Sequence, residues 1–454
     1  MRGRIVTTAI LAAGFAAILA VNLPGQLSYD SVAQLLDGRT GHYNSWHPPV
    51  MAWLLGFFDA LLPGPSLFVV FQAALVLGAL LSILWLRPRV SWAAAGMALL
   101  CLLIPQFFLY QGVVWKDVLF ADAAVAGFAA LAQAAAHWQH RHLRLGLILL
   151  AFLLLALAAM TRQNGLIALA AGGIALAVIA RCKDANPAQG GVAFLAALVL
   201  SVAISLVLTA QGDGGDGARA ELAMLQIYDM TGMLHAQPGL PLEKIRARDP
   251  GLESVLRGDG ERLYTPTRND TLYFAPPLVQ AISAAPRGLI FGQWQALVLA
   301  HPLAYLAMRV RLFGWVFFTP DIVACRPTYV GIDGPPDELK ALGLTARIRP
   351  SDRVLSRYAL DFDNTPIFSH PAFAVLAALG LFLLLRRRRP ADIVFACLLG
   401  AAIAFTASFF FISVACDYRY LYFLDLSVLV TFFYLTADPG GFVTKSALPR
   451  TSRE

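Results

Sequence analysis

The stretch MRGRIVTTAILAAGFAAILAVNL, residues 1–23, decides the class of fold. Its basic start and apolar run are typical of a signal peptide, but the run is about long enough to cross a bilayer and no small-residue cleavage site follows. We therefore interpret it as a first membrane span. The rest of the chain has the same character, since 58% of its 454 residues are apolar, 14% are charged and the mean hydropathy is +0.65. These values predict an all-α, polytopic membrane protein.

Apolar runs of roughly the length of a spanning helix, about 17–25 residues, recur along the chain. They lie at 5–23, 67–86, 91–110, 117–137, 144–160, 165–181, 191–210, 371–385, 391–411 and 419–436. The sequence therefore predicts about ten transmembrane helices.

Basic residues between these runs predict the orientation of the chain, because short cytoplasmic loops carry an excess of Lys and Arg. They fall on alternate sides of the spans, at Arg2 and Arg4, Arg87 and Arg89, Arg141 and Arg144, Arg181 and Lys183, Arg386 to Arg389, and Lys445 with Arg450. Both termini are therefore predicted to be cytoplasmic. The net charge of +7 is mostly this orientation signal, so it does not indicate a nucleic-acid partner. The basic, Ala-rich composition is typical of a Gram-negative bacterium of high genomic GC content, which predicts an inner-membrane protein.

Two further apolar stretches are expected to lie along the outer membrane surface. Residues 50–62, VMAWLLGFFDALL, are too short to span. Residues 287–319 carry Arg309 and Arg311 near their middle, where a charge costs about 2.5–3.5 kcal/mol at bilayer depth. The second stretch predicts one amphipathic interfacial helix bearing Trp294, His301, Tyr305, Arg309 and Trp315.

Three modules follow from this pattern. Residues 1–210 form an N-terminal transmembrane module with a first outer loop at 24–66, and 211–370 form an external segment that opens with the flexible QGDGGDG. Residues 371–454 form a C-terminal transmembrane module with a cytoplasmic tail. Cys325 and Cys416 fall outside the spans, where a disulfide could form, but two unpaired thiols are the preferred interpretation.

Polar residues at the membrane edge gather on the side away from the basic loops. They are Asp30 and His47 in the first loop, Lys116 and Asp117 in VVWKDVLF, Arg162 in TRQNGL, and Asp417 with Arg419 in ACDYRYLYF. Positive charges on that side oppose the orientation rule, so another group must hold them. An anionic partner such as a lipid-linked phosphate is the simplest candidate.

The order of these motifs carries a family resemblance. The chain has SYDS-AQ in the first loop, HPP entering the next helix, KD in the second outer loop, then R-NG and a late DYRY. In this order, and on one common side, they resemble the membrane-embedded GT-C glycosyltransferases, over residues 1–211 and 365–436. The resemblance implies the GT-C architecture, a polyprenyl-phosphate sugar as donor, and Asp30 as the catalytic base. No second acid adjoins Asp30 as in the Asp-x-Asp members, so the participation of a divalent cation is left open.

Chemistry supports the same placement of roles. Sugar transfer from a lipid phosphate needs a carboxylate that takes the acceptor proton and cations that stabilise the leaving phosphate. Asp30 suits the first task, and Lys116, Arg162 and Arg419 suit the second. Asp117 would face Asp30, where it could orient the acceptor or hold a metal ion.

Each of these residues also has a structural interpretation. Asp30 could be a helix cap with Ser28 or a plain interfacial acid, and Lys116 with Asp117 an adjacent ion pair at a helix start. Arg162 could extend to lipid headgroups.

The residues of the late motif and of the loop exit are similarly ambiguous. Tyr418 and Tyr420 could contact the substrate with Arg419 or form an interfacial aromatic belt. His47 precedes two prolines, so a structural hydrogen bond is preferred over a contact to sugar or phosphate. Asp417 is a reserve base after Asp117, while Asp37, next to Gly38, is expected at a helix end.

The sequence thus predicts a glycosyltransferase that moves a sugar from a polyprenyl-phosphate donor to a glycan, lipid or protein acceptor on the outer, periplasmic face, by direct displacement with inversion. Two alternatives stay open: an O-antigen polymerase or ligase, which should not need Asp30, and a multispanning transporter. Motifs such as GxGxxG, the P-loop and HExxH are absent from the sequence, which gives no support to a nucleotide donor or a zinc hydrolase.

Overall fold

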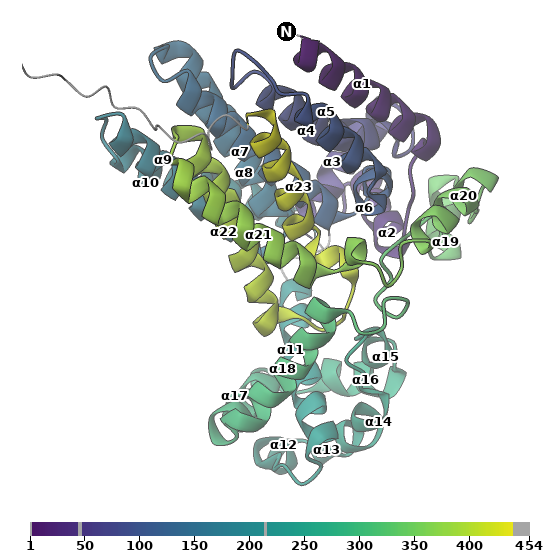
Figure 1. Ribbon diagram of the computed structural model, residues 1–454. Coiled ribbons are helices and arrows are strands. Elements are labelled where there is room, and N and C mark those ends of the chain that lie inside the picture. Colours follow the sequence, from purple (N-terminus) through teal and green to yellow (C-terminus); the bar gives the residue numbers. More distant parts are fainter. Residues whose placement is uncertain (1, 44–47, 213–215, 439–454) are drawn as a thin grey trace, which may run out of the picture.

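The computed structural model of the chain describes residues 2–43, 48–212 and 216–438, and these form helices joined by short connections (Figure 1). Nine helical segments in the described part are long and apolar enough to cross a membrane. They are α1 (Arg2–Asn22), α4 (Ser66–Ile83), α7 (Lys116–Ala136), α8 (Arg141–Thr161), η1 with α9 (Gln163–Gly165 and Leu166–Cys182), α10 (Ala188–Thr209), α21 (His370–Arg387), α22 (Pro390–Ile412), and η4 with α23 (Tyr418–Leu421 and Tyr422–Ala437). The predicted all-α membrane architecture is confirmed.

The predicted span at 91–110 is wrong. The structure has α5 (Ala93–Leu103) and α6 (Pro105–Tyr110), and neither is long enough to cross a bilayer. The break falls at Ile104, whose ψ of 122° is extended, because the ring of Pro105 disfavours helical backbone in the residue before it. The apolar run is continuous across this break, so hydropathy alone does not reveal it.

The first loop folds into a compact helical hairpin of α2 (Tyr29–Thr40) and α3 (Pro49–Leu61). The two helices approach closely at glycines: a Cβ on Gly38 would lie 2.2 Å from the carbonyl oxygen of Ala52. Arg39 Nη2 pairs with Asp59 Oδ1 at 2.6 Å and closes the hairpin near its end. The packing of α2 on α3 therefore supports the residues at the start of α2.

The lobe, defined here as residues 216–318, projects from the membrane helices (Figure 1). Its helices are α11 (Asp216–Ala236), α12 (Glu243–Arg248), α13 (Pro250–Val255), η2 (Leu256–Gly260), α14 (Glu261–Leu263), α15 (Asp270–Tyr273), α16 (Pro276–Ala284), α17 (Leu289–Ala300) and α18 (Pro302–Phe318). They bury a core of their own that includes Ile227, Leu256 and Leu278.

The prediction of one interfacial helix over 287–319 is wrong. The axes of α17 and α18 differ by 101°, because Pro302 follows His301 and disfavours helical backbone there. Arg309 is also not at a surface. It is fully buried, and its Nη2 lies 2.5 Å from Asp229 Oδ1 of α11.

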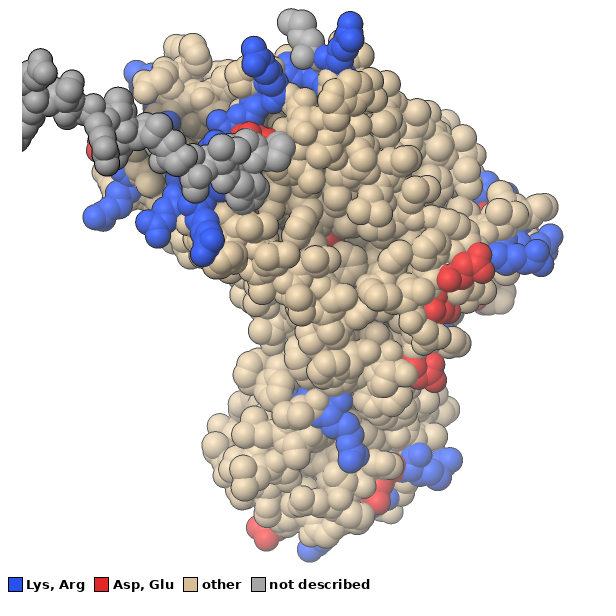
Figure 2. Space-filling view, in the orientation of Figure 1, with Lys and Arg blue, Asp and Glu red and all other residues tan. Residues whose placement is uncertain are grey.

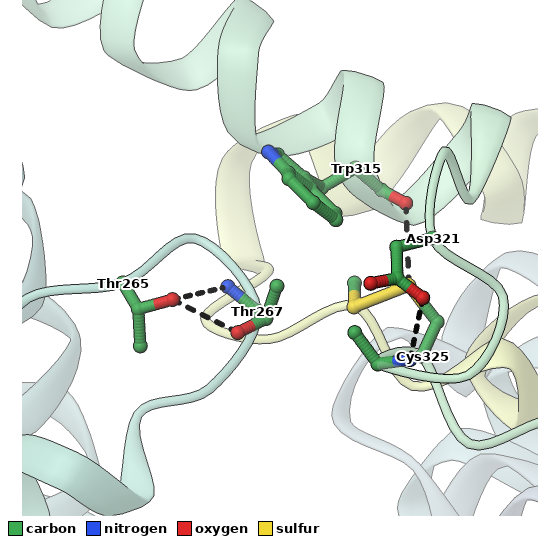
Figure 3. Close-up of a disulfide and its surroundings, with 7 residues drawn as sticks. Thr265, Thr267, Trp315, Asp321 and Cys325 are labelled. Carbon is green, nitrogen blue, oxygen red and sulfur yellow. Dashed lines mark hydrogen bonds between the residues drawn. A yellow bond between two sulfur atoms is a disulfide. The ribbon is translucent and has the colours of Figure 1, made fainter.

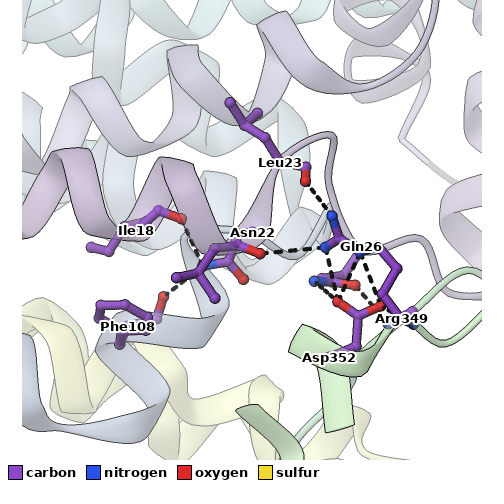
Figure 4. Close-up of polar contacts among 9 residues, drawn as sticks. Ile18, Asn22, Leu23, Gln26, Phe108, Arg349 and Asp352 are labelled. Atoms are coloured by element: carbon purple, nitrogen blue, oxygen red, sulfur yellow. Dashed lines mark hydrogen bonds and ion pairs between the residues drawn. The ribbon is translucent and has the colours of Figure 1, made fainter. Parts of the chain in front are cut away.

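The return segment, residues 319–369, carries the chain from the lobe back to the membrane helices. It contains α19 (Pro336–Leu342), α20 (Pro350–Leu360) and η3 (Pro366–Phe368). Its backbone pairs with the first loop, since the N–H of Leu27 donates to Gly331 O and the N–H of Asp333 donates to Leu27 O. Figure 4 shows the neighbouring side chains: Gln26 Nε2 donates to Asp352 Oδ1 at 3.1 Å. These contacts fix the start of the first loop against the return segment, which lies about 300 positions later in the sequence.

A disulfide joins Cys325 to Cys416, so the preference for two unpaired thiols is wrong (Figure 3). The two residues are 91 positions apart, with Cα atoms 4.9 Å apart. The backbone on either side is also held, because the N–H of Cys416 donates to Thr267 O at 3.1 Å and the N–H of Tyr418 donates to Cys325 O at 2.8 Å. These contacts tie the segment that enters η4 to the lobe and the return segment.

Basic residues gather at the end of the molecule near the N-terminus, above a broad uncharged band (Figure 2). Arg4 donates to Leu84 O, and Arg87, Arg387 and Arg389 all lie close to Asp438, so four chain segments meet there. Of the loops predicted to share a side, those at Arg4, Arg87 and Arg387 with Arg389 therefore do so. Lys445 and Arg450 lie outside the described residues. Val199 and Leu206 of α10 are about two-thirds exposed, as expected of a lipid-facing surface.

Candidate functional site

The polar cluster, defined here as Asp30, Lys116, Asp117, Arg162, Asp417 and Arg419, lies at the end of the helix bundle opposite the basic residues. Helices α7 and α8 form an antiparallel pair in which α7 begins at the cluster and α8 ends there. Helix α23 begins beside it and ends next to Asp438 at the basic end. The directions of the membrane helices thus bring together residues that are far apart in sequence.

Two arginines bridge the acids of the cluster. Arg162 Nη1 lies 2.5 Å from Asp117 Oδ1, and Arg419 Nε lies 3.7 Å from Asp117 Oδ2. Arg419 Nη2 lies 3.2 Å from both Asp30 Oδ2 and Asp417 Oδ2. Asp117 therefore joins the two guanidinium groups, and Arg419 joins the first loop to η4.

The side chains of the cluster differ in how far they are exposed to solvent. The side chain of Asp117 is 2% exposed, those of Arg162 and Arg419 are 10% and 13%, and that of Asp417 is 23%. Asp30 is 40% exposed, the largest fraction among these five. A molecule approaching from solvent would therefore meet the carboxylate of Asp30 before it met the buried pair.

Aromatic rings hold the guanidinium groups in place. The centre of the Arg419 guanidinium lies 4.7 Å from the ring centroid of Trp115, and that of Arg162 lies 5.3 Å from the ring of Tyr420. The ring centroid of Phe409 lies 5.4 Å from the centre of the same Arg162 guanidinium. Cation–π contacts of this kind contribute more stabilisation free energy where water is excluded. Tyr420, predicted as a substrate contact, is placed between the two arginines.

The start of α2 is fixed against the segment that precedes α7. Ser31 Oγ donates to Val114 O at 2.5 Å, and Trp115 Nε1 donates to Ser28 Oγ at 3.0 Å. Ser28 is the N-cap of α2, and its N–H donates to Ser31 Oγ at 3.2 Å. Asp30 therefore lies in the first turn rather than at the cap, where its negative charge is favoured by the helix dipole.

The sequence did not point to Glu221, an acid that the lobe adds to this region. Gln163 Nε2, directly after Arg162, donates to Glu221 Oε2 at 2.6 Å, and Lys116 and Arg162 are its charged neighbours. Burial raises the pKa of Glu221 to about 6, although the two cations and the hydrogen bond oppose that shift. No local signal marks this residue, because its proximity depends on how α11 leaves the membrane module.

Burial also raises the pKa of the Asp417 carboxyl above its usual range, opposed by Arg419 and assisted by Asp30 and Asp117. Asp417 is therefore easier to protonate than an exposed aspartate. Arg268 of the lobe is a further charged neighbour of Asp417 and is another residue that the sequence did not single out.

Two predicted residues are not seen in the cluster. Tyr418 is fully buried and turned away: its O–H donates to Asp425 Oδ2 at 2.8 Å, and its ring stacks on His370 with centroids 4.0 Å apart. His47 lies outside the described residues. The cluster therefore contains Tyr420 but not its neighbour Tyr418.

No three His, Cys, Asp or Glu side chains within residues 2–43, 48–212 and 216–438 come together as a metal site. The acids of the polar cluster face arginines instead of one another. The groups present at the site are the side chains of the polar cluster. They offer a partly exposed carboxylate beside three cationic side chains, an arrangement suited to proton transfer next to a bound phosphate.

Comparisons with known proteins give one structural match. No protein-family model matches the chain, and no curated protein matches it. One solved structure that matches is the archaeal oligosaccharyltransferase AglB from Archaeoglobus fulgidus, in complex with an inhibitory peptide and a dolichol-phosphate. The identity is 13%, the TM-score is 0.41, and the match covers 95% of this chain. The chain spans about half the length of the archaeal chain, since 50% of the latter is covered.

Proposed function

We propose that this protein is a GT-C-type glycosyltransferase that moves a sugar from a polyprenyl-phosphate donor to a hydroxyl or amine of a glycan, lipid or protein acceptor. The observation that carries the proposal is the pairing of Arg419 with the exposed carboxylate of Asp30, 3.2 Å apart, beside Arg162 and Lys116. General-base chemistry and phosphate stabilisation both have suitable groups within this one cluster.

The reaction is a direct displacement with inversion at the sugar C1. Asp30 takes the proton of the acceptor as the acceptor oxygen or nitrogen forms its bond to C1. The bond between C1 and the phosphate oxygen breaks, and polyprenyl phosphate leaves with the bonding pair. Arg419 and Arg162 stabilise the growing negative charge on the phosphate, and Lys116 adds a third positive charge.

Within this proposal the two acids have different tasks. Asp117 is 2% exposed and lies 2.5 Å from Arg162, so it orients that guanidinium rather than reacting with substrate. Asp30, at 40% exposure, is the acid that an acceptor can reach. Tyr420 keeps both arginines in place by its ring contacts.

We further propose that the cluster faces the periplasm of a bacterium, with both termini in the cytoplasm. Two observations support this orientation. The basic loops lie at the opposite end of the bundle, as the orientation rule requires of the cytoplasmic side. The disulfide between Cys325 and Cys416 lies beside Asp417, and disulfides persist in oxidising compartments.

The experiment that tests the proposal is a comparison of cell-envelope glycans by mass spectrometry, with and without the gene. We expect one glycan modification to disappear on deletion and to return with the wild-type protein and with Asp37→Asn, which alters an acid of the same helix. Asp30→Asn at equal expression should not restore it. An unchanged glycan profile under conditions of expression would contradict the proposal.

A further inference from the structure

Glu221 places an acid of the lobe beside the cations of the polar cluster. It lies near the start of α11, where the chain has just left the membrane helices, and it accepts a hydrogen bond of 2.6 Å from Gln163. Its charged neighbours are Lys116 of α7 and Arg162 at the end of α8. In the proposed function, these are two of the three residues that bind the phosphate of the donor.

The positive charges of this region are already matched by carboxylates, so a further anion would have to compete with one of them. The cations are Lys116, Arg162 and Arg419, with Arg268 of the lobe beside Asp417, and the acids are Asp30, Asp117, Asp417 and Glu221. A phosphodiester would add one more negative charge to a partly buried site where each of these cations already has an acidic neighbour. Like charges repel strongly when water is scarce, so one carboxylate must lose its charge or move away.

The structure indicates which carboxylate does so. Asp117 is almost completely buried against Arg162, and Arg419 holds both Asp30 and Asp417. Glu221 accepts its hydrogen bond from the neutral amide of Gln163, which is exposed. Its pKa of about 6 means that protonating it near neutral pH costs little.

Other charges on α11 do not change this assignment. The next acid along the helix, Asp229, lies about two turns away and is paired with Arg309. Arg219, two residues before Glu221, is exposed. The groups that face Glu221 from other elements are therefore Lys116, Arg162 and Gln163.

We propose that Glu221 is an exchangeable counter-ion, which faces Lys116 and Arg162 in the empty site and gives way when the phosphodiester of the donor binds. It gives way by taking up a proton or by turning out toward solvent with its exposed partner Gln163. This inference rests on the proposed function, because it takes a lipid phosphodiester as the ligand. It adds that the lobe regulates the entry of that ligand.

The inference predicts a pH dependence with a definite sign. Below about pH 6 Glu221 is already mostly neutral in the empty site, so its effect on affinity is small. Above that pH the empty site holds a carboxylate that must be neutralised or displaced, and affinity for a phosphodiester falls as pH rises. Asp417, the acid of the polar cluster whose pKa burial raises, is the alternative source of such a slope.

Binding of farnesyl methyl phosphate to the purified full-length protein tests this directly, because this phosphodiester keeps a single negative charge from pH 5 to 8. We expect Glu221→Gln to bind it about three- to tenfold more tightly than the wild type at pH 7.5 and equally at pH 5. Glu221→Ala should behave in the same way. Glu261→Gln, on α14 of the lobe, is the matched control and should follow the wild-type curve.

The outcomes separate this inference from the proposed function. If the wild type binds the phosphodiester and Arg419→Ala weakens it, but Glu221→Gln shows wild-type affinity at every pH, the counter-ion inference is wrong. Weaker binding by Glu221→Gln overturns it as well, and so does loss of the pH slope in Asp417→Asn alone. If the wild type does not bind the phosphodiester at any pH, the proposed function fails first.

Discussion

Two Arg–Asp pairs in this molecule have the same length and different surroundings. Arg162 and Asp117 lie 2.5 Å apart in the polar cluster, and Arg309 and Asp229 lie 2.5 Å apart inside the lobe, between α18 and α11. Both residues of the second pair are 0% exposed, whereas the first pair borders Arg419 and the accessible Asp30. The length of an ion pair therefore does not distinguish a structural contact from a binding site.

The other partners of each pair make the distinction. Arg309 Nη1 donates to Ser413 O at 2.9 Å, and Trp294 Nε1 donates to Asp229 Oδ2 at 2.9 Å, so α11, α17, α18 and the end of α22 meet at this pair. In the polar cluster, Arg419 pairs with the buried Asp117 and with the partly exposed Asp30 and Asp417. The first arrangement fastens elements together, and the second can exchange one partner for a ligand.

The largest expected effect is on folding. Arg309→Leu leaves Asp229 buried without its cation, and breaking such a pair typically costs about 3–5 kcal/mol of unfolding free energy. We expect a clear fall in the thermal unfolding midpoint of the purified protein in detergent. The double variant Arg309→Leu with Asp229→Leu should recover much of the loss, because no unpaired charge remains. If Arg309→Leu were as stable as the wild type, the Arg309–Asp229 pair would not be a structural contact, and the contrast with the polar cluster would fail.

A smaller effect, of a different kind, is expected in the polar cluster. Arg419→Ala removes one charge-assisted contact to the donor phosphate, which is worth about 1.5–3 kcal/mol, so donor affinity should fall roughly 10- to 150-fold. Arg419→Lys should restore it only partly, because a lysine lacks the forked donor geometry. Isothermal titration with a short-chain polyprenyl-phosphate sugar measures this. Wild-type affinity in the alanine variant would assign Arg419 to the aromatic belt instead.

The smallest effect sharpens the comparison within one short helix. Tyr418→Phe removes the hydrogen bond to Asp425 and should lower stability by about 1 kcal/mol, while donor affinity stays at the wild-type value. The same titration and the same thermal unfolding measurement apply. Loss of donor affinity without loss of stability would return Tyr418 to the binding site from which the structure turns it away.

The sequence predicted the membrane helices well because long apolar runs are a local signal. It did not predict the break at Pro105, which lies inside an apolar run, or the bend at Pro302, where two helices of ordinary apolar composition meet. Arg309 was assigned to a surface because its partner, Asp229, is 80 positions earlier in the chain and no local pattern connects them. The pairing of Cys325 with Cys416 was considered but not preferred, because these residues are 91 positions apart and no local pattern connects them.

The residues of the candidate site were easier to predict from the sequence than the Arg309–Asp229 pair or the disulfide. Sorting polar residues by the side of the membrane on which they lie brought Asp30, Lys116, Asp117, Arg162, Asp417 and Arg419 into one group, and the structure places them together. Which of them pair could not be predicted, because pairing depends on the packing of α2, α7 and η4. Glu221 was missed since it enters from the lobe, outside the pattern of spans and loops.

The central claim is that Asp30 accepts the acceptor proton in a sugar transfer from a polyprenyl-phosphate donor. Asp30→Asn keeps the size of the side chain but removes its basicity. In a purified transfer assay we predict that turnover falls roughly 10²- to 10⁴-fold. Donor binding and expression should stay close to wild type, and Asp37→Asn should have little effect. Transfer by Asp30→Asn at the wild-type rate would contradict the account.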